Sequence, residues 1–472
     1  MTDALWLPIE MVAAVQGVPS GAPAPAFGVS IDSRSLNKGD LFIALVGPNA
    51  DGHRHVADAL AKGAAAAVVA HAPTGLPAGV PLIKVDDTQA ALERLGQAAR
   101  ARSAARIAAI TGSVGKTSTK EMLAAVLAAQ APTHWAAASS NNQWGVPLSL
   151  ARMPRAAGYG VFELGMNHAG EIAALTRQVR PEVAIITTIE AAHLEFFSSI
   201  EEIADAKAEI FLGMDADGTA ILNADNPMHD RLAAAARVAG LRRILSFGTG
   251  TNCDIRLISV TPVAEGSDVE AEILGRRLAY RLSLPGRHLA MNSLAVLGAT
   301  QLLGADVELA ARALATLPGL AGRGRQQKIA VQGGEAVLID ESYNASPAAM
   351  HAAFAVLEAA RPGASGRRIA VLGDMRELGE QAPALHAALA EPLIAAHADL
   401  VYTAGPLMRH LHDALPASLQ GAWRANAAEL LPLLVDGLRP GDIVTVKGSL
   451  GSRMADIVKP LMAGAAASRI AS

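Results

Sequence analysis

A short glycine-containing segment, Thr111-Gly112-Ser113-Val114-Gly115-Lys116-Thr117, constrains the fold of this chain more than any other feature. The apolar run 106–110 before it is typical of a buried strand, and the residues after it favour a helix. A strand that turns through glycines into a helix presents the N–H groups of the helix N-terminus to an anion. The segment therefore predicts a phosphate-binding loop, with Lys116 on the terminal phosphates and the Thr117 hydroxyl on a Mg²⁺ ion.

One position departs from the general pattern of such loops. Ile110 stands where the pattern has a glycine, five residues before Gly115. The alternative interpretation is a strand-to-helix turn that binds no ligand. The intact Gly-Lys-Thr and the strand and helix on either side favour the phosphate-binding interpretation.

The composition excludes several classes of protein. The 472 residues are 51% hydrophobic and 18% charged, which permits large cores in about two to four domains and excludes a disordered chain. The formal net charge is -4 and no basic tract stands out, so we expect no nucleic-acid partner.

Further features bear on the cellular compartment. The single cysteine, Cys253, excludes an internal disulfide framework and fits a reducing compartment. We find no signal-peptide pattern, and no apolar run approaches the roughly 20 residues that cross a bilayer. The sequence therefore predicts a cytoplasmic enzyme without a membrane span.

Changes in the pattern of strand-like runs, helical stretches and Gly/Pro-rich turns divide the chain into three regions, 1–104, 105–319 and 320–472. The linker candidate is residues 317–324. Strand-like runs alternate with helical stretches, and this alternation is typical of parallel sheets covered on both faces. We predict an α/β fold with a small N-terminal domain, a central phosphate-loop domain with a parallel sheet, and a C-terminal Rossmann-like domain.

Two polar residues follow apolar runs in the central region. Glu163 follows the apolar residues 160–162 and precedes Leu164, and His193 follows the run 183–187. Ligands of α/β sheets bind beyond the carboxyl ends of strands, and Mg²⁺ prefers oxygen donors, so both are metal-site candidates. Each has an alternative: Glu163 as a solvated loop glutamate and His193 as a structural histidine.

Motifs on both sides of the loop extend the pattern along most of the chain. They are Asp32-Ser33-Arg34, Asp51-Gly52-His53, Asn141-Asn142-Gln143-Trp144, Glu163-Leu164-Gly165-Met166-Asn167, Ala192-His193-Leu194-Glu195, Ala206-Lys207-Ala208-Glu209, Asn223-Ala224-Asp225, Asp340-Glu341-Ser342-Tyr343-Asn344, Gly373-Asp374-Met375-Arg376-Glu377 and Lys447-Gly448-Ser449. Their order resembles the Mur ligases of peptidoglycan synthesis nearly end to end.

The resemblance implies roles for the matched positions. The catalytic residues would be Lys116, Glu163, His193 and Lys207, and Mg²⁺ would be bound by Thr117, Glu163, His193 and Lys207. Lys207 matches a lysine that family members carry as a carbamate, which is an anionic oxygen donor. ATP would contact Thr111, Gly112, Ser113, Val114, Gly115, Lys116, Thr117, Ser118, Asn142, Asn223, Asn292, Arg323, Asp340, Tyr343 and Asn344. The UDP-sugar end and other substrate groups would contact Ser33, Arg34, Asp51, Gly52, His53, Asp374 and Lys447.

Several of these assignments have plain structural alternatives. Lys207 stands in a charge-rich segment where a solvated lysine is ordinary, and Arg323 can be a linker charge. Asp340 can be a cap after its strand, and Asn141 and Asn142 can be turn residues. Asp32 and Arg34 can form a local surface ion pair.

The resemblance implies an ATP-dependent ligase that joins D-alanyl-D-alanine to UDP-N-acetylmuramoyl-tripeptide through an acyl phosphate, in a monomer that serves cell-wall synthesis, cell shape and cell division. Glu195 or His193 would accept the proton of the attacking amine. The alternatives are a sibling ligase adding one amino acid, a folylpolyglutamate synthetase, and a nucleotide switch protein. Asp32-Ser33-Arg34 argues against the folate enzyme. The segment 373–379, which lacks the Asn-Pro-Arg signature of one sibling, argues against that sibling.

Overall fold

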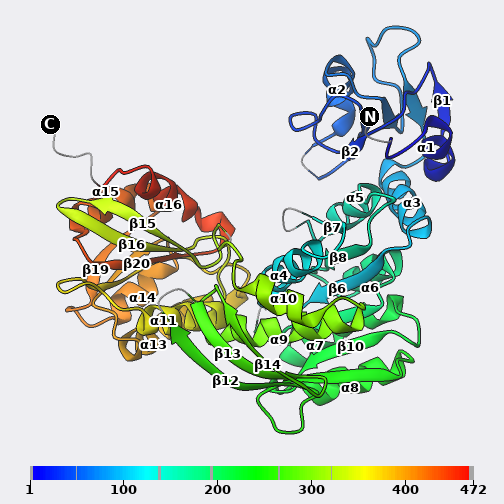
Figure 1. Ribbon diagram of the computed structural model, residues 1–472. Coiled ribbons are helices and arrows are strands. Elements are labelled where there is room, and N and C mark those ends of the chain that lie inside the picture. The colour runs from blue at the N-terminus through cyan, green and yellow to red at the C-terminus, as the bar shows by residue number, and fades with distance from the viewer. Residues whose placement is uncertain are drawn as a thin grey trace.

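Three β-sheets follow one another along the chain, each with helices packed on it (Figure 1). The computed structural model describes residues 4–48, 50–136, 140–191, 195–263, 266–319 and 321–466. We call the elements α1 to α3 the first domain, β6 to α10 the central domain and β15 to α16 the third domain. The predicted three-domain α/β fold is thereby confirmed. Within the described residues, none of the helices combines the length and apolar character that crossing a bilayer requires.

The first domain is built on a five-stranded sheet in the order β1-β5-β4-β3-β2. All neighbours are parallel except β1, which runs antiparallel to β5 at the edge. The strands are β1 (Val18–Ser20), β2 (Gly28–Ser30), β3 (Asp40–Ile43), β4 (Ala66–Val69) and β5 (Leu82–Lys84), and the helices are α1 (Pro8–Val15), α2 (Val56–Ala61) and α3 (Thr88–Ala101).

The central domain contains a nine-stranded sheet in the order β14-β13-β12-β11-β10-β9-β6-β8-β7. The strands from β7 to β12 are parallel, and β13 and β14 extend the sheet as antiparallel neighbours. The carboxyl ends of parallel strands meet at one edge, so β6, β8, β9 and β10 bring their following loops together. The strands are β6 (Arg106–Thr111), β7 (Thr133–Trp135), β8 (Tyr159–Glu163), β9 (Val183–Ile186), β10 (Thr219–Asn223), β11 (Arg243–Gly248), β12 (Ile255–Val263), β13 (Gly266–Ile273) and β14 (Arg276–Leu282).

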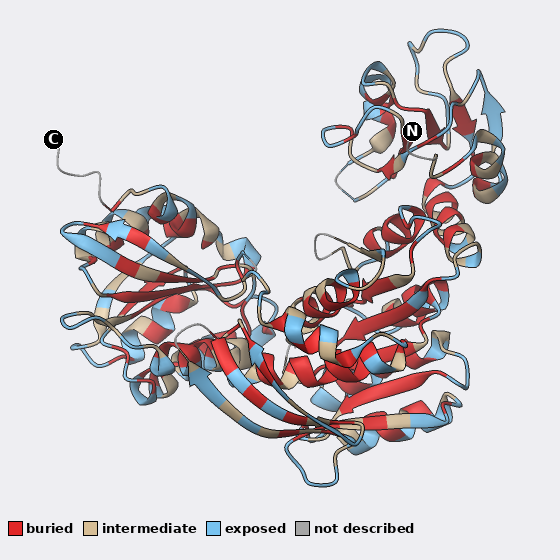
Figure 2. Cartoon of the chain, viewed as in Figure 1, coloured by how far each residue is buried: buried red, intermediate tan, exposed pale blue. Residues whose placement is uncertain are grey.

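Helices cover both faces of the central sheet, as the buried strand sequences predict (Figure 2). One core joins the sheet to α4 (Lys116–Ala128), α9 (Arg287–Leu302) and α10 (Val307–Leu314). The other core joins it to α5 (Gly145–Ala151), α6 (Glu171–Val179), α7 (Ile200–Ala208) and α8 (His229–Val238). Because α9 packs against both α4 and the sheet, its sequence is apolar on most sides.

The third domain has a six-stranded sheet in the order β15-β16-β20-β17-β18-β19, parallel except for the β15–β16 hairpin. Its strands are β15 (Arg325–Val331), β16 (Gly334–Glu341), β17 (Arg368–Gly373), β18 (Leu400–Ala404), β19 (Gln420–Arg424) and β20 (Ile443–Lys447). Its helices are α11 (Pro347–Ala359), α12 (Ala382–Ala387), α13 (Ala390–Ala395), α14 (Met408–Ala414), α15 (Ala427–Gly437) and α16 (Ala455–Met462).

The first and central domains share a packed junction. Leu148 and Ala151 of α5 belong to the same buried cluster as the first-domain sheet and helices. The Trp6 indole Nε1 donates to the Ala151 carbonyl at 2.9 Å, and Arg152 Nε donates to the Val29 carbonyl at 2.6 Å. Arg102 lies over the Trp6 ring, 3.5 Å from its centroid. These contacts join the two sheets through apolar packing and hydrogen bonds together.

A buried ion pair holds two neighbouring strands of the third domain at their starts. Asp442 lies just before β20 and is fully buried, and Arg367 lies just before β17. The Asp442 carboxylate accepts hydrogen bonds from the Arg367 backbone N–H at 2.9 Å and its Nη2 at 2.7 Å, and from the Arg439 N–H at 2.9 Å. The pair therefore fixes where both strands enter the sheet.

We predict that Arg367→Ala destabilises the third domain, because it leaves the Asp442 charge buried without its main partner. Removing one member of a buried pair costs about 3 kcal/mol of unfolding free energy. Differential scanning calorimetry should show a lower unfolding temperature. The control is Arg361→Ala, at an exposed arginine of the same domain; equal unfolding temperatures for the two variants would contradict the prediction.

Candidate functional site at the phosphate loop

The loop between β6 and α4 requires glycine at two positions. Gly112 has φ 145° and Gly115 has φ 87°, both in the region that side chains disfavour. A Cβ on Gly112 would lie 2.0 Å from Thr187 Oγ1, and one on Gly115 would lie 2.7 Å from Asn292 Nδ2. The loop backbone therefore packs directly against Thr187 and Asn292. Helix α4 starts at Lys116, and its N-cap residue, Gly115, has no side chain to cap the first N–H groups.

Lys116 folds back onto the loop that precedes it. Its Nζ donates to the Gly112 carbonyl at 2.6 Å and to the Ser113 carbonyl at 3.2 Å. Burial lowers the pKa of this lysine, while the charge of Glu163 acts in the opposite direction. The loop thus holds a partly buried positive charge beside its own backbone, at the cavity wall.

Glu163 ends β8 as a buried acceptor next to the loop. It is 5% exposed, so the alternative of a solvated loop glutamate is wrong. Its Oε2 accepts from Thr117 Oγ1 at 2.7 Å, and its Oε1 accepts from Asn141 Nδ2 at 2.8 Å. A carboxylate and a hydroxyl oxygen therefore stand side by side, and such oxygen donors suit Mg²⁺.

Lys207 is buried at the end of α7, with 1% of its surface exposed. The alternative of a solvated lysine is therefore wrong. Burial and then the positive charge of Lys116 lower its pKa well below the usual value. Within the part of the chain that the structure describes, the Lys207 ammonium takes part in no hydrogen bond and no ion pair. An isolated buried ammonium is costly, so this position favours a neutral amine or a modified, anionic side chain.

The predicted metal ligand His193 lies outside the described residues, as do its neighbours 192 and 194. The loop is described again from Glu195, whose N–H donates to the Glu377 carbonyl of the third domain at 3.4 Å. Residues just after His193 therefore reach the third domain.

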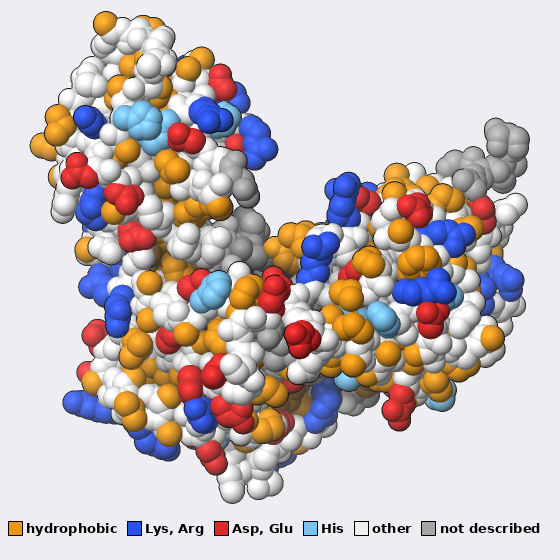
Figure 3. Space-filling model, turned by 180° about the vertical axis from the view of Figure 1, so that it is seen from behind, with side chains coloured by type: hydrophobic (Ala, Val, Ile, Leu, Met, Phe, Trp, Pro, Cys, Tyr) orange, Lys and Arg blue, Asp and Glu red, His pale blue; other side chains and the backbone are white. Residues whose placement is uncertain are grey.

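A cavity of about 390 Å³ lies where the central and third domains meet. Figure 3 shows the notch between the first and third domains, with the central domain below it. Many predicted site residues line the cavity, from both domains. They are Ser113, Val114, Gly115, Lys116, Thr117, Ser118, Glu163, Arg323, Tyr343, Asn344 and Lys447.

Third-domain residues on the cavity wall form two small clusters. The Arg323 guanidinium lies over the Tyr343 ring, 4.4 Å from its centroid, and its charge acts on Lys116. Lys447 is 3% exposed, and its Nζ donates to Glu341 Oε2 at 3.2 Å and to the Asn344 carbonyl at 3.1 Å. Arg323 is thus a cavity residue as well as a member of the segment between the domains.

Some predicted ATP contacts lie behind the cavity wall. Thr111 is buried in β6, and Asn292 stands behind Gly115. Asn223 Nδ2 donates to the Thr187 carbonyl at 3.0 Å. These residues support the loop from behind.

Two other predicted ATP contacts shape local turns. Asn142 Oδ1 accepts from the Gly145 N–H at 2.9 Å at the start of α5, while the neighbouring Asn141 is the one that lines the cavity. Asp340 accepts from the Gly322 N–H at 2.7 Å and from Ser342 Oγ at 2.6 Å. Asp340 therefore fixes the chain that carries Arg323.

Asp374 is also a structural acceptor in this arrangement. Its Oδ1 accepts from the Met408 N–H at 2.8 Å at the start of α14, and burial raises its pKa. Adding a Cβ to Gly405 would bring that atom within 2.3 Å of the same carboxylate oxygen. Asp374 is absent from the residues that line the cavity.

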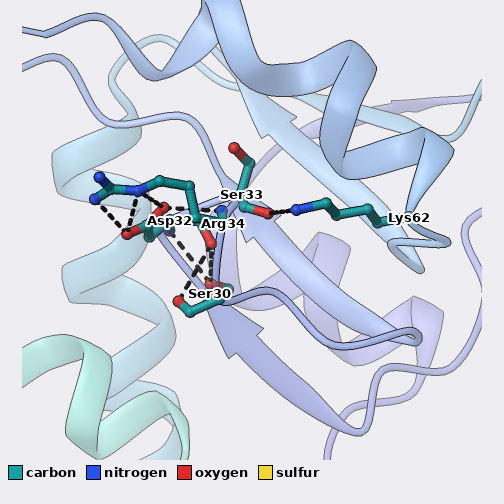
Figure 4. A network of polar contacts seen from close by, with 6 residues as sticks. Ser30, Asp32, Ser33, Arg34 and Lys62 are labelled. Carbon is teal, nitrogen blue, oxygen red and sulfur yellow. Dashed lines mark hydrogen bonds and ion pairs between the residues drawn. The ribbon is translucent and has the colours of Figure 1, made fainter.

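The predicted substrate residues Ser33 and Arg34 lie in the first domain, in a network of polar contacts with Ser30, Asp32 and Lys62 (Figure 4), and neither lines this cavity. Arg34 forms a two-pronged contact with Asp32, from Nε to Oδ1 at 2.9 Å and from Nη2 to Oδ2 at 2.7 Å. Hydrogen bonds from Arg34 lower the pKa of Asp32 to about 2. The Ser33 carbonyl accepts from Lys62 Nζ at 2.6 Å. The Asp32–Arg34 contact is a surface ion pair, and the Arg34 side chain is 90% exposed.

The turn at Asp51, Gly52 and His53 has a defined histidine tautomer. His53 Nε2 accepts from the Ala70 N–H at 2.9 Å, so the proton is on Nδ1, which donates to Asp51 Oδ1 at 2.7 Å. His71 stacks on His53 with a centroid distance of 4.2 Å. Asp51, His53 and His71 are close enough to share a metal ion, but both nitrogens of His53 are already engaged.

The structure adds residues that the sequence predictions did not name as site residues. Asn141, His288, Glu341, Arg376, Glu377 and Ser449 also line the cavity. Burial lowers the pKa of His288. Five of the six stand inside or directly beside the motifs that carry the family resemblance, but the motifs alone do not show which side chain faces the cavity.

Sequence profiles of known families match most of the chain. The profile described as "Mur ligase family, catalytic domain" matches residues 27–100, "Mur ligase middle domain" matches residues 110–300, and "Mur ligase, glutamate ligase domain" matches residues 324–450. A UDP-N-acetylmuramoyl-tripeptide--D-alanyl-D-alanine ligase from Escherichia coli (strain K12) is 36% identical over 450 residues, which cover 95% of this chain and 96% of the relative.

Solved structures agree with the sequence relatives. Crystal structure I of MurF from Acinetobacter baumannii matches with a TM-score of 0.85 at 30% identity, over 97% of this chain and 99% of that chain. The MurF ligase from Thermotoga maritima in complex with ADP matches with a TM-score of 0.78 at 25% identity, over 93% and 97%. Because profiles, a full-length relative and solved structures coincide, the chain belongs to the Mur ligase family.

Proposed function

We propose that this chain is an ATP-dependent ligase that joins D-alanyl-D-alanine to a UDP-N-acetylmuramoyl-tripeptide in peptidoglycan precursor synthesis. The observation that carries the proposal is the single cavity in which the phosphate loop meets charged residues of the third domain. The names of the Escherichia coli relative and the Acinetobacter baumannii structure support this choice of substrates.

The residues at the loop fit the triphosphate of ATP. Glycine occupies both positions where a Cβ would collide, and α4 offers its N-terminus to an anion. Lys116 and Arg323 supply positive charge from the two facing domains. The Thermotoga maritima relative is a complex with ADP, which supports a nucleotide at this place. ATP would supply the phosphoryl group that converts the carboxylate of the tripeptide into an acyl phosphate.

The donor set beside the loop fits Mg²⁺. Thr117 Oγ1 and the Glu163 carboxylate are adjacent oxygens, and Lys207 and His193 would complete the set. A bound Mg²⁺ ion would neutralise charge on the transferring phosphoryl group. The other predicted ATP contacts then act indirectly: Asn223 and Asn292 support the loop, and Asp340 positions Arg323.

Lys207 suits a carbamate for a physical reason. A lowered pKa raises the fraction of neutral amine, and only the neutral amine adds to CO₂, releasing one proton as the N–C bond forms. The product is an anion, so its interaction with Lys116 changes from repulsion to attraction. Carbamylation therefore relieves the isolated charge that the unmodified lysine would carry.

The first and third domains would bind the rest of the substrate and shield the reaction from water. The first domain would hold the UDP-sugar end through Ser33, Arg34 and the turn at 51–53. The third domain closes the cavity over the loop, which excludes water from the activated carboxylate. The amine of the dipeptide would then attack the acyl carbon and expel phosphate.

The proposed function predicts that phosphate release from ATP requires both UDP-N-acetylmuramoyl-tripeptide and D-alanyl-D-alanine. A coupled phosphate assay with each substrate omitted in turn checks this. Equal turnover with a single amino acid in place of the dipeptide would indicate a sibling ligase. Phosphate release that needs neither substrate would indicate a nucleotide switch.

Lys116→Ala should abolish ATP-dependent product formation, because it removes the loop's positive charge. We expect a loss of at least about a hundredfold in kcat/KM with the unfolding temperature retained. The control is Lys328→Ala, at a lysine whose side chain is 76% exposed on β15. Turnover of Lys116→Ala near that of the control would refute the assignment of the loop.

Lys207→Ala should lose activity that high bicarbonate does not restore, whereas short carboxylic acids restore part of it by supplying an anion. Carbamylation itself is checked without turnover, by ¹³C NMR after addition of ¹³C-bicarbonate. The unmutated protein should show a carbamate signal that Lys207→Ala lacks. The same signal in both proteins, or full activity of the plain variant, would refute the carbamate.

A further inference from the structure

The phosphate loop needs support from outside because its chain turns at two glycines, Gly112 and Gly115. Glycine loses more conformational freedom on ordering than any other residue. A ligand that has to order a loop by itself loses part of its binding free energy to that ordering. The affinity of the loop for a nucleotide therefore depends on contacts that hold the loop in place before the nucleotide binds.

Ser113 lies in the middle of the loop, and its hydrogen-bonding groups are turned towards the neighbouring chain. Its N–H donates to the Thr188 carbonyl at 2.8 Å, and its Oγ donates to the Glu190 carbonyl at 3.1 Å. The same Oγ accepts from the Glu190 N–H at 3.0 Å. Both hydrogens that Ser113 could offer to a phosphate are therefore engaged inside the protein, although the residue lines the cavity.

These partners belong to one short segment, residues 187–190, which follows β9. Thr187 binds the loop as well: its N–H donates to the Thr111 carbonyl at 3.0 Å, and its Oγ1 donates to the Val114 carbonyl at 2.5 Å. The segment therefore contacts the loop on both sides of its first glycine. None of the four residues of the segment, all of which the structure describes, lines the cavity.

Asn226 holds the same segment from the opposite side. It lies just after β10, and β9 stands between β10 and β6 in the sheet. Its Nδ2 donates to the Ile189 carbonyl at 2.8 Å and to Thr188 Oγ1 at 3.0 Å. Its Oδ1 accepts from the Met228 N–H at 3.0 Å, which fixes the orientation of the amide. The segment 187–190 is thus held between Asn226 and the phosphate loop.

Asn226 is remote from any ligand in the cavity. It is 7% exposed, and it is not among the described residues that line the cavity. The sequence predictions assigned nucleotide contact to Asn223 of the same motif and gave Asn226 no role. An effect of Asn226 on nucleotide binding would therefore have to pass through the segment and the loop.

We propose that Asn226 and the segment 187–190 form a template that holds the phosphate loop in its nucleotide-binding conformation, with Ser113 as the loop residue that docks on it. Asn226 is a positioning residue, and the Ser113 hydroxyl serves the conformation of the loop rather than a phosphate oxygen. The inference rests on the proposed function, because it concerns the nucleotide that the proposed reaction consumes.

The first test changes the template while keeping its shape. Asn226→Asp retains the acceptor for the Met228 N–H and replaces the donating amide by an oxygen that faces the Ile189 carbonyl. Isothermal titration calorimetry of the full chain with ADP and Mg²⁺ should show a dissociation constant about tenfold higher or more. The control is Asn252→Asp, at an exposed asparagine of the same domain. A dissociation constant equal to that of the control would overturn the proposal.

Kinetics separate a positioning role from general damage to the fold. In Asn226→Asp, KM for ATP should rise with the dissociation constant for ADP, while KM for D-alanyl-D-alanine at saturating ATP stays within about twofold. Thr187→Val removes the hydrogen bond to the Val114 carbonyl without changing the shape of the side chain, and it should weaken ADP binding in the same way. This second variant keeps the proposal falsifiable if Asn226→Asp does not fold.

The second test examines the docking residue. Ser113→Ala removes both side-chain hydrogen bonds to Glu190 and should weaken ADP binding, whereas Ser418→Ala, at an exposed serine, should not. Because Ser113 and Asn226 act through one segment, the double variant should lose less affinity than the product of the two single losses. A loss confined to Ser113→Ala, or two losses that multiply, would indicate direct phosphate contact and overturn the proposal.

The unmutated protein separates the two levels of inference. If it binds no ADP, the proposed function fails. If it binds ADP and releases phosphate from ATP with both substrates present, and the variants bind ADP as tightly as it does, only the template is wrong.

Discussion

Two desolvated lysines at the edge of the central sheet are the constraint on which the rest of the site depends. Lys207 is buried and Lys116 is partly buried at the cavity wall, and desolvation lowers the pKa of each. Charge in such a place needs anionic partners at close range. Glu163 is one such partner, and phosphate groups and a carbamate are the others that we propose. The glycine loop, the third-domain wall and the metal ligands are therefore parts of one electrostatic arrangement.

The domain architecture follows from the sequence because its signals are local. Apolar runs of four to six residues between helical stretches predict buried parallel strands, and β6, β8, β9 and β10 lie where those runs occur. The junction between the first and central domains was not predictable, because Trp6 and Ala151 are 145 residues apart in sequence.

The site was predictable to the level of motifs and less so to the level of side chains. Gly112 and Gly115 have the positive φ angles that a tight glycine-containing turn requires, because this feature depends on the local backbone alone. The sequence does not show which member of a motif faces the cavity, because some members accept hydrogen bonds from the N–H groups at a helix start instead. Asn142 caps α5 while Asn141 faces Glu163, and Asp374 caps α14 while Glu377 faces the cavity. Family motifs contain residues that cap helices and residues that line the cavity, and only the tertiary structure distinguishes the two.

Residues of two domains line the cavity, so its shape depends on how those domains are placed. The first and central domains share a core, whereas the third domain meets the phosphate loop mainly across the cavity. The phosphate loop lines the cavity from the central domain, and Arg323, Arg376 and Glu377 line it from the third domain. A change in the separation of the two domains would therefore change both the volume of the cavity and the charge that a bound ligand meets.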